Sequence, residues 1–109
     1  QKKSIGDETA PIKMVEFASL TCGHCARFHN EVFPLLKKDY IDNGKIFFTY
    51  QDFPLDKYAL KASVIARCSG NEKYFSFLKV LYKNGMAHIP KLAFDRMLLD
   101  VFSHIYQSN

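Results

Sequence analysis

The sequence predicts an α/β fold in which two parallel strands, joined through a helix, precede a helical segment. Two apolar runs, Ile12–Ala18 and Lys45–Tyr50, have the composition and length of strands. Between them, apolar residues recur at helical spacing from Cys22 to Tyr40. A strand, a helix and a strand connected by short links make a βαβ unit, whose strands run parallel. The helix begins at a Cys-x-x-Cys pair, the strongest chemical signal in the chain.

Length and composition limit the chain to one domain, residues 1–109. We expect the βαβ unit at residues 12–50 and the helical segment at 56–106. Hydrophobic residues make up 48% and charged residues 24%, as is ordinary for a globular protein. No apolar stretch approaches the roughly 18 residues of a membrane-spanning helix. No signal peptide is recognisable, so an exported chain would already have lost it. The net charge of +4 is spread over helical segments that also carry acids, which opposes nucleic-acid binding.

The first half begins with a polar stretch, residues 1–10, which predicts a flexible lead-in. Ile12–Ala18 then predicts a buried central strand, covered on both faces. The helix that follows should end at Asn43-Gly44. Pro34 within it predicts a kink, because proline lacks an N–H and clashes with the preceding turn. The apolar face of this helix consists of Cys25, Phe28, Val32, Leu35 or Leu36, and Tyr40.

The second half predicts three helices. Asp56 is the expected N-cap of the first, and Gly70 ends it. Asn71 caps the second and Asn84-Gly85 stops it. This helix is apolar on nearly all sides, as a buried helix is, with Tyr74, Phe75, Phe77, Leu78, Leu81 and Tyr82. A third helix follows Pro90, with Phe94, Met97, Leu98, Val101, Phe102 and Ile105 at helical spacing. With only two strands predicted, both edges of the sheet are expected to be unpaired.

Cys22 and Cys25 have the spacing of a redox pair at the start of a helix. The nucleophile of thiol–disulfide exchange is the thiolate, and a free cysteine with a pKa of about 8.5 is mostly protonated at neutral pH. Unpaired backbone N–H groups and the positive end of the helix dipole favour a thiolate at Cys22. His24 adds a positive charge when it is protonated. Cys22 is therefore expected to form the mixed disulfide, which Cys25 resolves from the core side.

Three other roles are open to a Cys-x-x-Cys pair. A structural disulfide across so small a loop removes little entropy from the unfolded chain and is a poor staple. Zinc is the stronger rival, because Cys22, Cys25 and His29 supply three ligands, with Cys68 or His24 as a fourth. Against zinc, no second Cys-x-x-Cys or histidine pair completes the usual site. Covalent haem requires a histidine directly after the second cysteine, where this chain has alanine.

The stretch from Val15 to His29, VEFASLTCGHCARFH, closely resembles the DsbA-type, thioredoxin-like thiol:disulfide oxidoreductases. The similarity covers about residues 12–85 and includes Phe33-Pro34, Tyr40, Lys45–Tyr50, Asp52-Phe53-Pro54-Leu55 and Ala66-Arg67-Cys68. The resemblance implies a thioredoxin-like fold with an inserted helical domain. It also implies a bacterial periplasmic enzyme that needs no cofactor or metal. Such an enzyme oxidises cysteine-containing protein substrates and is reoxidised by a membrane quinone-linked partner.

The resemblance also implies roles for individual residues. Glu16 stands where the family has a buried acid beneath the active site, and would exchange a proton with Cys25; an exposed glutamate without a role is the alternative. Gly23-His24 resembles the dipeptide of protein disulfide isomerase more than the Pro-His of bacterial oxidases. Since the isomerase has a potential of about −180 mV and DsbA of about −120 mV, we expect an enzyme less oxidising than DsbA. Cys68 is expected to be a buried small hydrophobe, with an interchain disulfide as the minor alternative.

The second half of the family pattern is not recognisable in this sequence. The thioredoxin fold adds two antiparallel strands, a closing helix and a cis-proline loop that faces the Cys-x-x-Cys pair. Pro90 is the only later proline and precedes a helical pattern, and residues 86–109 do not resemble the family. Two hypotheses follow. The chain is an oxidoreductase whose missing strands come from a partner chain or a second copy, or it is a remnant with little catalysis that binds itself or a partner. Both predict self-association.

Overall fold

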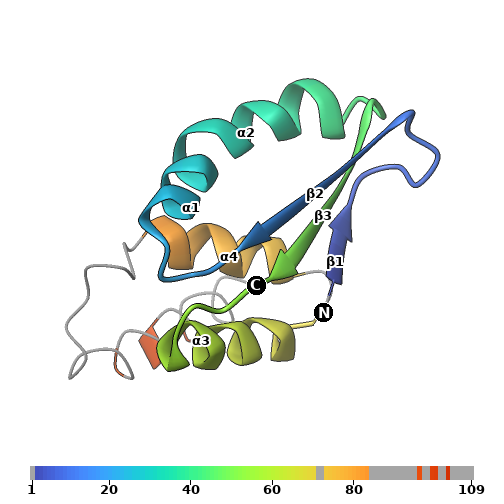
Figure 1. Ribbon diagram of the computed structural model, residues 1–109. Helices are drawn as coiled ribbons and strands as arrows, with labels where there is room; N and C mark the ends of the chain where they lie inside the picture. The colour runs from blue at the N-terminus through green and yellow to red at the C-terminus, as the bar shows by residue number, and fades with distance from the viewer. Residues whose placement is uncertain (1, 71–72, 84–95, 97–98, 101–102, 104–109) are drawn as a thin grey trace.

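The computed structural model describes residues 2–70, 73–83, 96, 99–100 and 103. A three-stranded sheet with strand order β1-β3-β2 forms its centre (Figure 1). β2 (Ile12–Ala18) and β3 (Ile46–Asp52) run parallel along their full length. β1 (Lys2–Ile5) runs antiparallel to β3 on its other side. The predicted α/β fold is confirmed, and the two parallel strands are joined through a helical stretch as the sequence indicated.

The polar stretch at residues 1–10 is not only a flexible lead-in, because it contains β1. Lys3 pairs with Tyr50, and Ile5 with Phe48. A four-residue strand with one packed face has too few apolar positions to stand out in a sequence. β3 is therefore paired on both sides, and the expectation that both strands of the parallel pair have a free edge is wrong.

β2 is an edge strand of the described sheet, not the central strand that its apolar run predicted. Phe17 is 68% exposed, and Ile12 and Val15 are about half exposed. Glu16, which points to the face opposite Val15 and Phe17, is partly buried. In contrast, Tyr50 of β3 has no exposed surface. An apolar run indicates a strand, but the neighbours that cover each face are set by the topology of the sheet.

One continuous helical stretch follows the Cys-x-x-Cys pair and comprises α1 (Gly23–Arg27), η1 (Phe28–Val32), α2 (Phe33–Leu36) and η2 (Lys37–Ile41). η1 and η2 are π-helical turns. Pro34 lies in the first turn of α2. Just before it, the N–H of Phe33 bonds to the carbonyl of Phe28, five residues back. The predicted disturbance at Pro34 is thus accompanied by a widened turn, a frequent feature at functional sites.

The π-helical turns change which side chains face the core. Val32 and Tyr40, which a regular helical period placed inward, are 48% and 46% exposed. Of the two candidates Leu35 and Leu36, Leu36 packs against the core and Leu35 is exposed. His29 and Ile41 are buried instead. Each π-helical turn holds more residues than an α-helical turn, so a strict 3.6-residue period assigns the wrong residues to the inner face.

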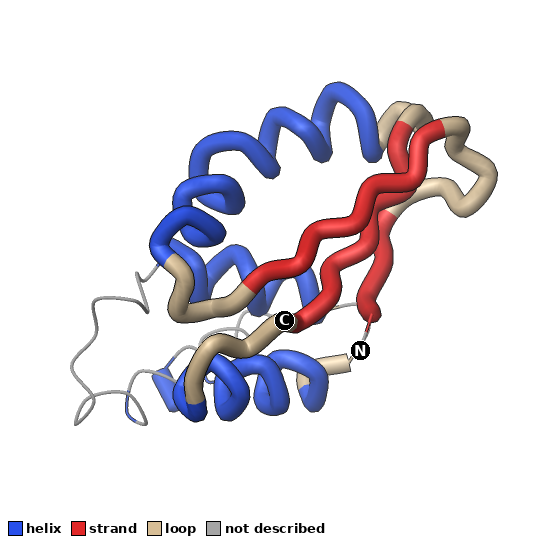
Figure 2. The backbone as a smooth tube through the Cα atoms, viewed as in Figure 1, coloured by secondary structure: helices blue, strands red, loops and turns tan. Residues whose placement is uncertain are grey.

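Two further helices, α3 (Lys57–Cys68) and α4 (Tyr74–Lys83), follow the sheet. Asp56 caps α3 as predicted, since its carboxylate accepts the N–H of Ala59 at 2.8 Å. α4 packs against α1, η1 and α3. In the view of Figure 2, the sheet lies between the α1–η2 stretch and α3. The core joins Phe48 and Tyr50 of β3 to the buried residues of α4, which are Tyr74, Phe77, Leu78, Leu81 and Tyr82.

Cys68 is exposed, so the expectation of a buried cysteine is wrong. The buried face of α3 consists of small residues, Ala59, Ala62, Ser63 and Ala66, and Cys68 lies off that face. The predicted caps at Asn71 and Asn84, and most of the helix predicted after Pro90, lie outside the described residues. Within the described ranges, no helix has the length and apolar character to cross a bilayer.

Candidate active site

Cys22 occupies the N-cap position of α1. β2 ends at Ala18, and a turn closed by a hydrogen bond from the Cys22 N–H to the Ser19 carbonyl leads to it. The Cys22 Sγ accepts the backbone N–H of Cys25 at 3.4 Å. This N–H has no partner of its own within the helix, so the sulfur takes the place of the usual capping oxygen. Both thiols are free and partly buried.

The two thiols have pKa values shifted in opposite directions. A hydrogen bond from the Cys25 thiol lowers the pKa of Cys22; burial opposes this, and the backbone N–H groups of Cys25 and His24 lower it further. Burial, followed by the hydrogen bond to Cys22, raises the pKa of Cys25 to about 11. At neutral pH the site therefore favours a thiolate at Cys22 in front of a protonated thiol at Cys25.

His24 influences Cys22 through its backbone N–H. Its imidazole is exposed, in the loop between the two cysteines. The role predicted for the charge of this side chain stays a prediction.

Glu16 and His29 form a buried pair on the inner side of the site. Glu16 Oε1 and His29 Nε2 lie 2.7 Å apart, and their side chains are 13% and 3% exposed. The negative charge of Glu16 adds to the raised pKa of Cys25 and partly opposes the lowered pKa of Cys22. The carboxylate therefore lies within electrostatic reach of the two thiols. The alternative of an exposed glutamate is therefore wrong.

His29 is the residue that sequence reasoning missed, since it was considered only as a zinc ligand. Its Nε2 faces Glu16, and in the described ranges no three His, Cys, Asp or Glu side chains are grouped as a metal site requires. A usable signal was present. His29 follows Cys25 by four residues, which places both on one face of a helix, and Glu16 faces the same layer from β2.

A second buried carboxylate lies at the end of β3, at a position that the sequence suggested was a loop. Asp52 is 2% exposed and accepts hydrogen bonds from Arg67 Nε at 2.9 Å and from Ser63 Oγ at 3.1 Å. These contacts attach α3 to the strand that lies beside the cysteine-bearing turn. The sequence contained no local signal for them, because the partners are 11 and 15 residues apart along the chain.

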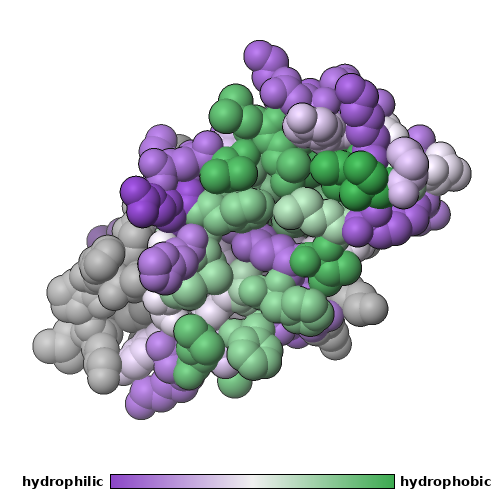
Figure 3. Space-filling view, turned by 45° about the horizontal axis from the view of Figure 1, so that its top comes forward, coloured by the Kyte–Doolittle hydropathy of each residue, from purple (hydrophilic) through white to green (hydrophobic). Residues whose placement is uncertain are grey.

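The turn that carries the cysteines is joined to the loop after β3. The Leu55 N–H donates to Ser19 Oγ at 3.3 Å, and the Thr21 hydroxyl donates to Asp56 Oδ2 at 3.1 Å. Beside these contacts, Leu55, Phe53 and the neighbouring Phe17 are all more than 60% exposed. Figure 3 shows hydrophobic side chains gathered over one face of the molecule, with hydrophilic ones around them. An exposed apolar surface of this kind is typical of a site that binds a polypeptide.

The family model described as "Thioredoxin" matches residues 1–102 of the chain. The chain belongs to the thioredoxin family. A Rickettsia conorii relative named for protein-disulfide oxidoreductase activity is 40% identical over 74 residues, which cover 68% of this chain and 27% of the relative. Wolbachia pipientis alpha-DsbA1 is 33% identical with a TM-score of 0.73, over 98% of this chain and 65% of that one. Chlamydia trachomatis DsbA, at 24% identity and a TM-score of 0.75, shares the fold.

Within the thioredoxin family, the predicted resemblance to DsbA-type thiol:disulfide oxidoreductases is confirmed. The family match extends beyond the predicted residues 12–85, so the expectation that the resemblance ends before residue 86 is wrong for residues 86–102. This thioredoxin-family chain spans about a quarter of the length of its Rickettsia relative and about two thirds of alpha-DsbA1. The family match at residues 1–102 contains the Cys-x-x-Cys turn, its helix and the strand that carries Glu16.

Proposed function

We propose that this chain exchanges disulfides with cysteine-containing polypeptides through Cys22 and Cys25. The observation that supports this most strongly is the position of Cys22 at the N-cap, with the Cys25 N–H at 3.4 Å from its sulfur and the Cys25 thiol in the same turn. The lowered pKa of Cys22 makes it both an available nucleophile and a good leaving group, while the raised pKa of Cys25 keeps that thiol protonated until it is needed.

In the oxidising direction, a substrate thiolate attacks Cys22 Sγ in the Cys22–Cys25 disulfide. The bond between the two cysteines breaks, a mixed disulfide forms at Cys22, and Cys25 leaves as a thiolate that takes a proton from Glu16. A second substrate thiolate then attacks the substrate sulfur of the mixed disulfide. The substrate gains a disulfide, and Cys22 leaves as the stabilised thiolate. In the reducing direction, the Cys22 thiolate attacks a substrate disulfide, and one substrate sulfur leaves as a thiolate. Cys25 then returns its proton to Glu16 and attacks Cys22 in the mixed disulfide, and the second substrate sulfur leaves as a thiolate.

We further propose, from the resemblance, that the enzyme works in the periplasm and is reoxidised by a membrane quinone-linked partner. The exposed His24 imidazole would stabilise the Cys22 thiolate when it is protonated. The Gly-His dipeptide, which resembles that of protein disulfide isomerase at about −180 mV, supports an enzyme less oxidising than DsbA at about −120 mV. Equilibration of the cysteine pair with glutathione would measure it, and a value near the −270 mV of thioredoxin would contradict the proposal.

Self-association is supported by the outer edge of β2, which is unpaired among the described residues, and by the exposed side chains of Ile12, Val15 and Phe17 on this strand. Sedimentation analysis would test it, and a monomer at all concentrations would contradict it. The alternative function, a remnant with little catalysis, is not favoured, because relatives are named for oxidoreductase activity.

The direct test is oxidation of a peptide that contains two cysteines, or reduction of insulin, by the purified chain. Cys22→Ala should abolish turnover, whereas Cys68→Ala, which alters an exposed thiol on α3, should leave it unchanged. Turnover that survives Cys22→Ala would overturn the proposal. A parent chain without turnover would support the remnant alternative instead.

A further inference from the structure

The contact between Glu16 and His29 joins the cysteine-bearing helix to β2 inside the molecule. The Oε1–Nε2 distance of 2.7 Å is that of a strong hydrogen bond, and both side chains are nearly buried. A buried carboxylate is costly unless a donor satisfies it. Here the donor comes from the same helix as Cys25, four residues further along.

The His29 ring is held in place by other rings. It stacks on Tyr82, with centroids 4.4 Å apart and planes at 7°, and Tyr50 meets it edge-on at 5.6 Å. The two tyrosine hydroxyls are hydrogen-bonded to each other at 2.7 Å, and that of Tyr82 also donates to the Ser19 carbonyl at 3.2 Å. The position of Nε2 is therefore set by packing, independently of Glu16.

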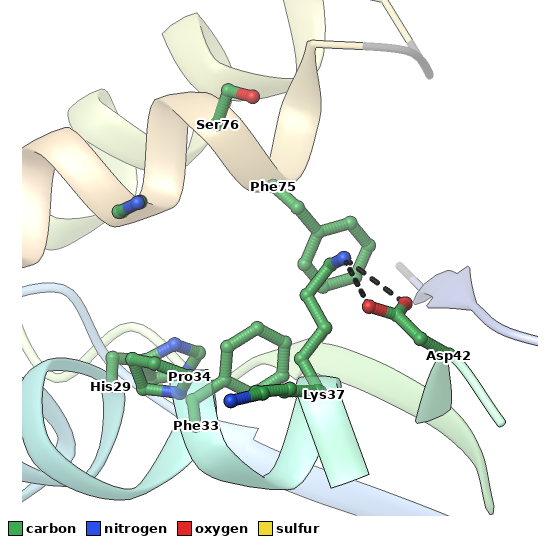
Figure 4. Close-up of a pocket in the computed structure, with 9 residues that line it drawn as sticks. His29, Phe33, Pro34, Lys37, Asp42, Phe75 and Ser76 are labelled. Atoms are coloured by element: carbon green, nitrogen blue, oxygen red, sulfur yellow. Dashed lines mark hydrogen bonds and ion pairs between the residues drawn. The ribbon is translucent and has the colours of Figure 1, made fainter. Parts of the chain in front are cut away.

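The opposite side of His29 contributes to a pocket of about 390 Å³ between the η1–η2 stretch and α4. Figure 4 shows His29 beside Phe33, with the ring of Phe75 and the Lys37–Asp42 ion pair further along the wall. Lys38 and Lys79 also line it, and both are exposed, so water can reach the pocket. Among the described residues, the charged and titratable groups around the Glu16–His29 pair are thus the two thiols, the buried tyrosines and these pocket residues; the tyrosines are Tyr50, Tyr74 and Tyr82.

We propose that His29 is the positioning residue of Glu16. Its Nε2–H donates to Oε1 and holds the carboxylate so that the second oxygen exchanges the proton of Cys25. When Cys25 attacks Cys22 in the mixed disulfide, its S–H bond breaks and an O–H bond forms on Glu16, while the His29 N–H stays in place. The Cys22–Cys25 bond forms as the bond from Cys22 to the substrate sulfur breaks, and the substrate leaves as a thiolate. The reverse transfer occurs when the Cys22–Cys25 disulfide opens. This inference rests on the proposed role of Glu16.

The attack by Cys25 can be observed by itself. The reduced chain, in a Cys68→Ser background, is mixed with 5,5′-dithiobis(2-nitrobenzoate) in a stopped-flow instrument. Cys22 reacts first and releases one coloured thiolate, and Cys25 then attacks the mixed disulfide and releases a second. The rate of the second phase, measured from acidic to neutral pH, reports how readily Cys25 loses its proton.

His29→Phe keeps an aromatic ring but removes the donor, and should slow the second phase about tenfold and alter its pH profile. This loss is smaller than the roughly 10²–10⁴-fold effect of removing a general acid–base group itself. His29→Gln keeps an N–H donor and should restore the rate to within about twofold of the parent. In a Glu16→Gln background, His29→Phe should have no further effect, because its partner no longer accepts a proton.

An unchanged second phase in His29→Phe, or an equal loss in His29→Gln and His29→Phe, would overturn the inference. If His29→Phe alone unfolds because it leaves the Glu16 carboxylate without a donor, the variant that combines Glu16→Gln with His29→Phe has no such charge. Its second phase can then be compared with that of Glu16→Gln alone. If Glu16→Gln itself leaves the second phase unchanged, the proposed role of Glu16 fails as well. If Glu16→Gln slows it and His29→Phe does not, only the positioning role of His29 fails.

Discussion

The Cys25 thiol makes the largest contribution to the lowered pKa of Cys22, so replacing it should raise that pKa. Cys25→Ala removes the S–H donor, whereas Cys25→Ser keeps an O–H donor of similar size. We expect Cys22 in the alanine variant to titrate closer to 9.0, the ordinary value, and to be alkylated more slowly at neutral pH. The serine variant should retain most of the shift.

The parent chain provides the magnitude. At pH 7 a thiol with a pKa of about 11 is ionised to about one part in 10⁴, whereas one with a pKa below 9.0 is ionised to more than about one part in 10². The more basic thiolate reacts faster per molecule by about tenfold, from a Brønsted slope of about 0.4–0.5 over two pKa units. Cys22 should therefore be alkylated at least about ten times faster than Cys25.

The assay uses limiting iodoacetamide on reduced protein in a Cys68→Ser background, followed by proteolysis and mass spectrometry of each cysteine peptide. Over a pH series, the labelling rate of Cys22 should reach half of its maximum below pH 9, whereas that of Cys25 should reach half of its maximum near pH 11. Labelling of Cys25 at the same rate as Cys22 would refute the assignment of nucleophile and resolving thiol. Identical Cys22 profiles in Cys25→Ala and Cys25→Ser would refute the hydrogen bond as the cause of the shift.

Three further predictions concern stability. First, folding lowers the pKa of Cys22 below 9.0, so between the folded and the unfolded pKa the unfolded chain binds more protons than the folded one. The free energy of unfolding of the reduced protein, relative to that of Cys22→Ser, should therefore rise with pH until about 9. Denaturant unfolding over a pH series measures this difference, and a difference that does not change with pH would contradict the prediction. Arg67→Gln leaves a buried carboxylate without its charged partner and should lower the free energy of unfolding by about 3 kcal/mol. Arg27→Gln removes an exposed ion pair and should lower the free energy of unfolding by about 0.5 kcal/mol or less. Equal losses in Arg67→Gln and Arg27→Gln would refute the distinction between the buried and the exposed ion pair. Gly6→Ala places a Cβ 2.8 Å from a β3 carbonyl oxygen at a φ of +110°, and should cost about 2 kcal/mol or more. A Cβ at Gly23 meets no atom within 4 Å, so Gly23→Ala should melt at or above the parent temperature, and a fall as large as that of Gly6→Ala would contradict this.

Short-range signals in the sequence located the reactive part of the site. The Cys-x-x-Cys spacing, the change from an apolar run to a helical period, and Asp56 as an N-cap each depend on residues only a few positions apart. The structure agrees with all three. Glu16 could be singled out because it is the one acid in a mainly apolar strand and because of the family resemblance.

The faces of the elements could not be obtained in the same way. The inner face of the long helix was misassigned because two π-helical turns change its period after Cys25, and a fixed period cannot anticipate them. The burial of β2 was overestimated, because only the strand order shows that β3, and not β2, lies at the centre of the described sheet. β1 was missed because its pairing with β3 joins residues more than 40 positions apart.

The sequence alone therefore located a cysteine pair with the spacing of a redox site at a helix start, with an acid in the preceding strand. Only the tertiary structure showed that His29 turns inward to meet that acid, and that α4 closes over it with the ring of Tyr82. The physical reason is the range of the interactions. Caps and turns are decided by neighbours in the chain, whereas a buried hydrogen bond between β2 and η1 exists only after the sheet and helices have packed together.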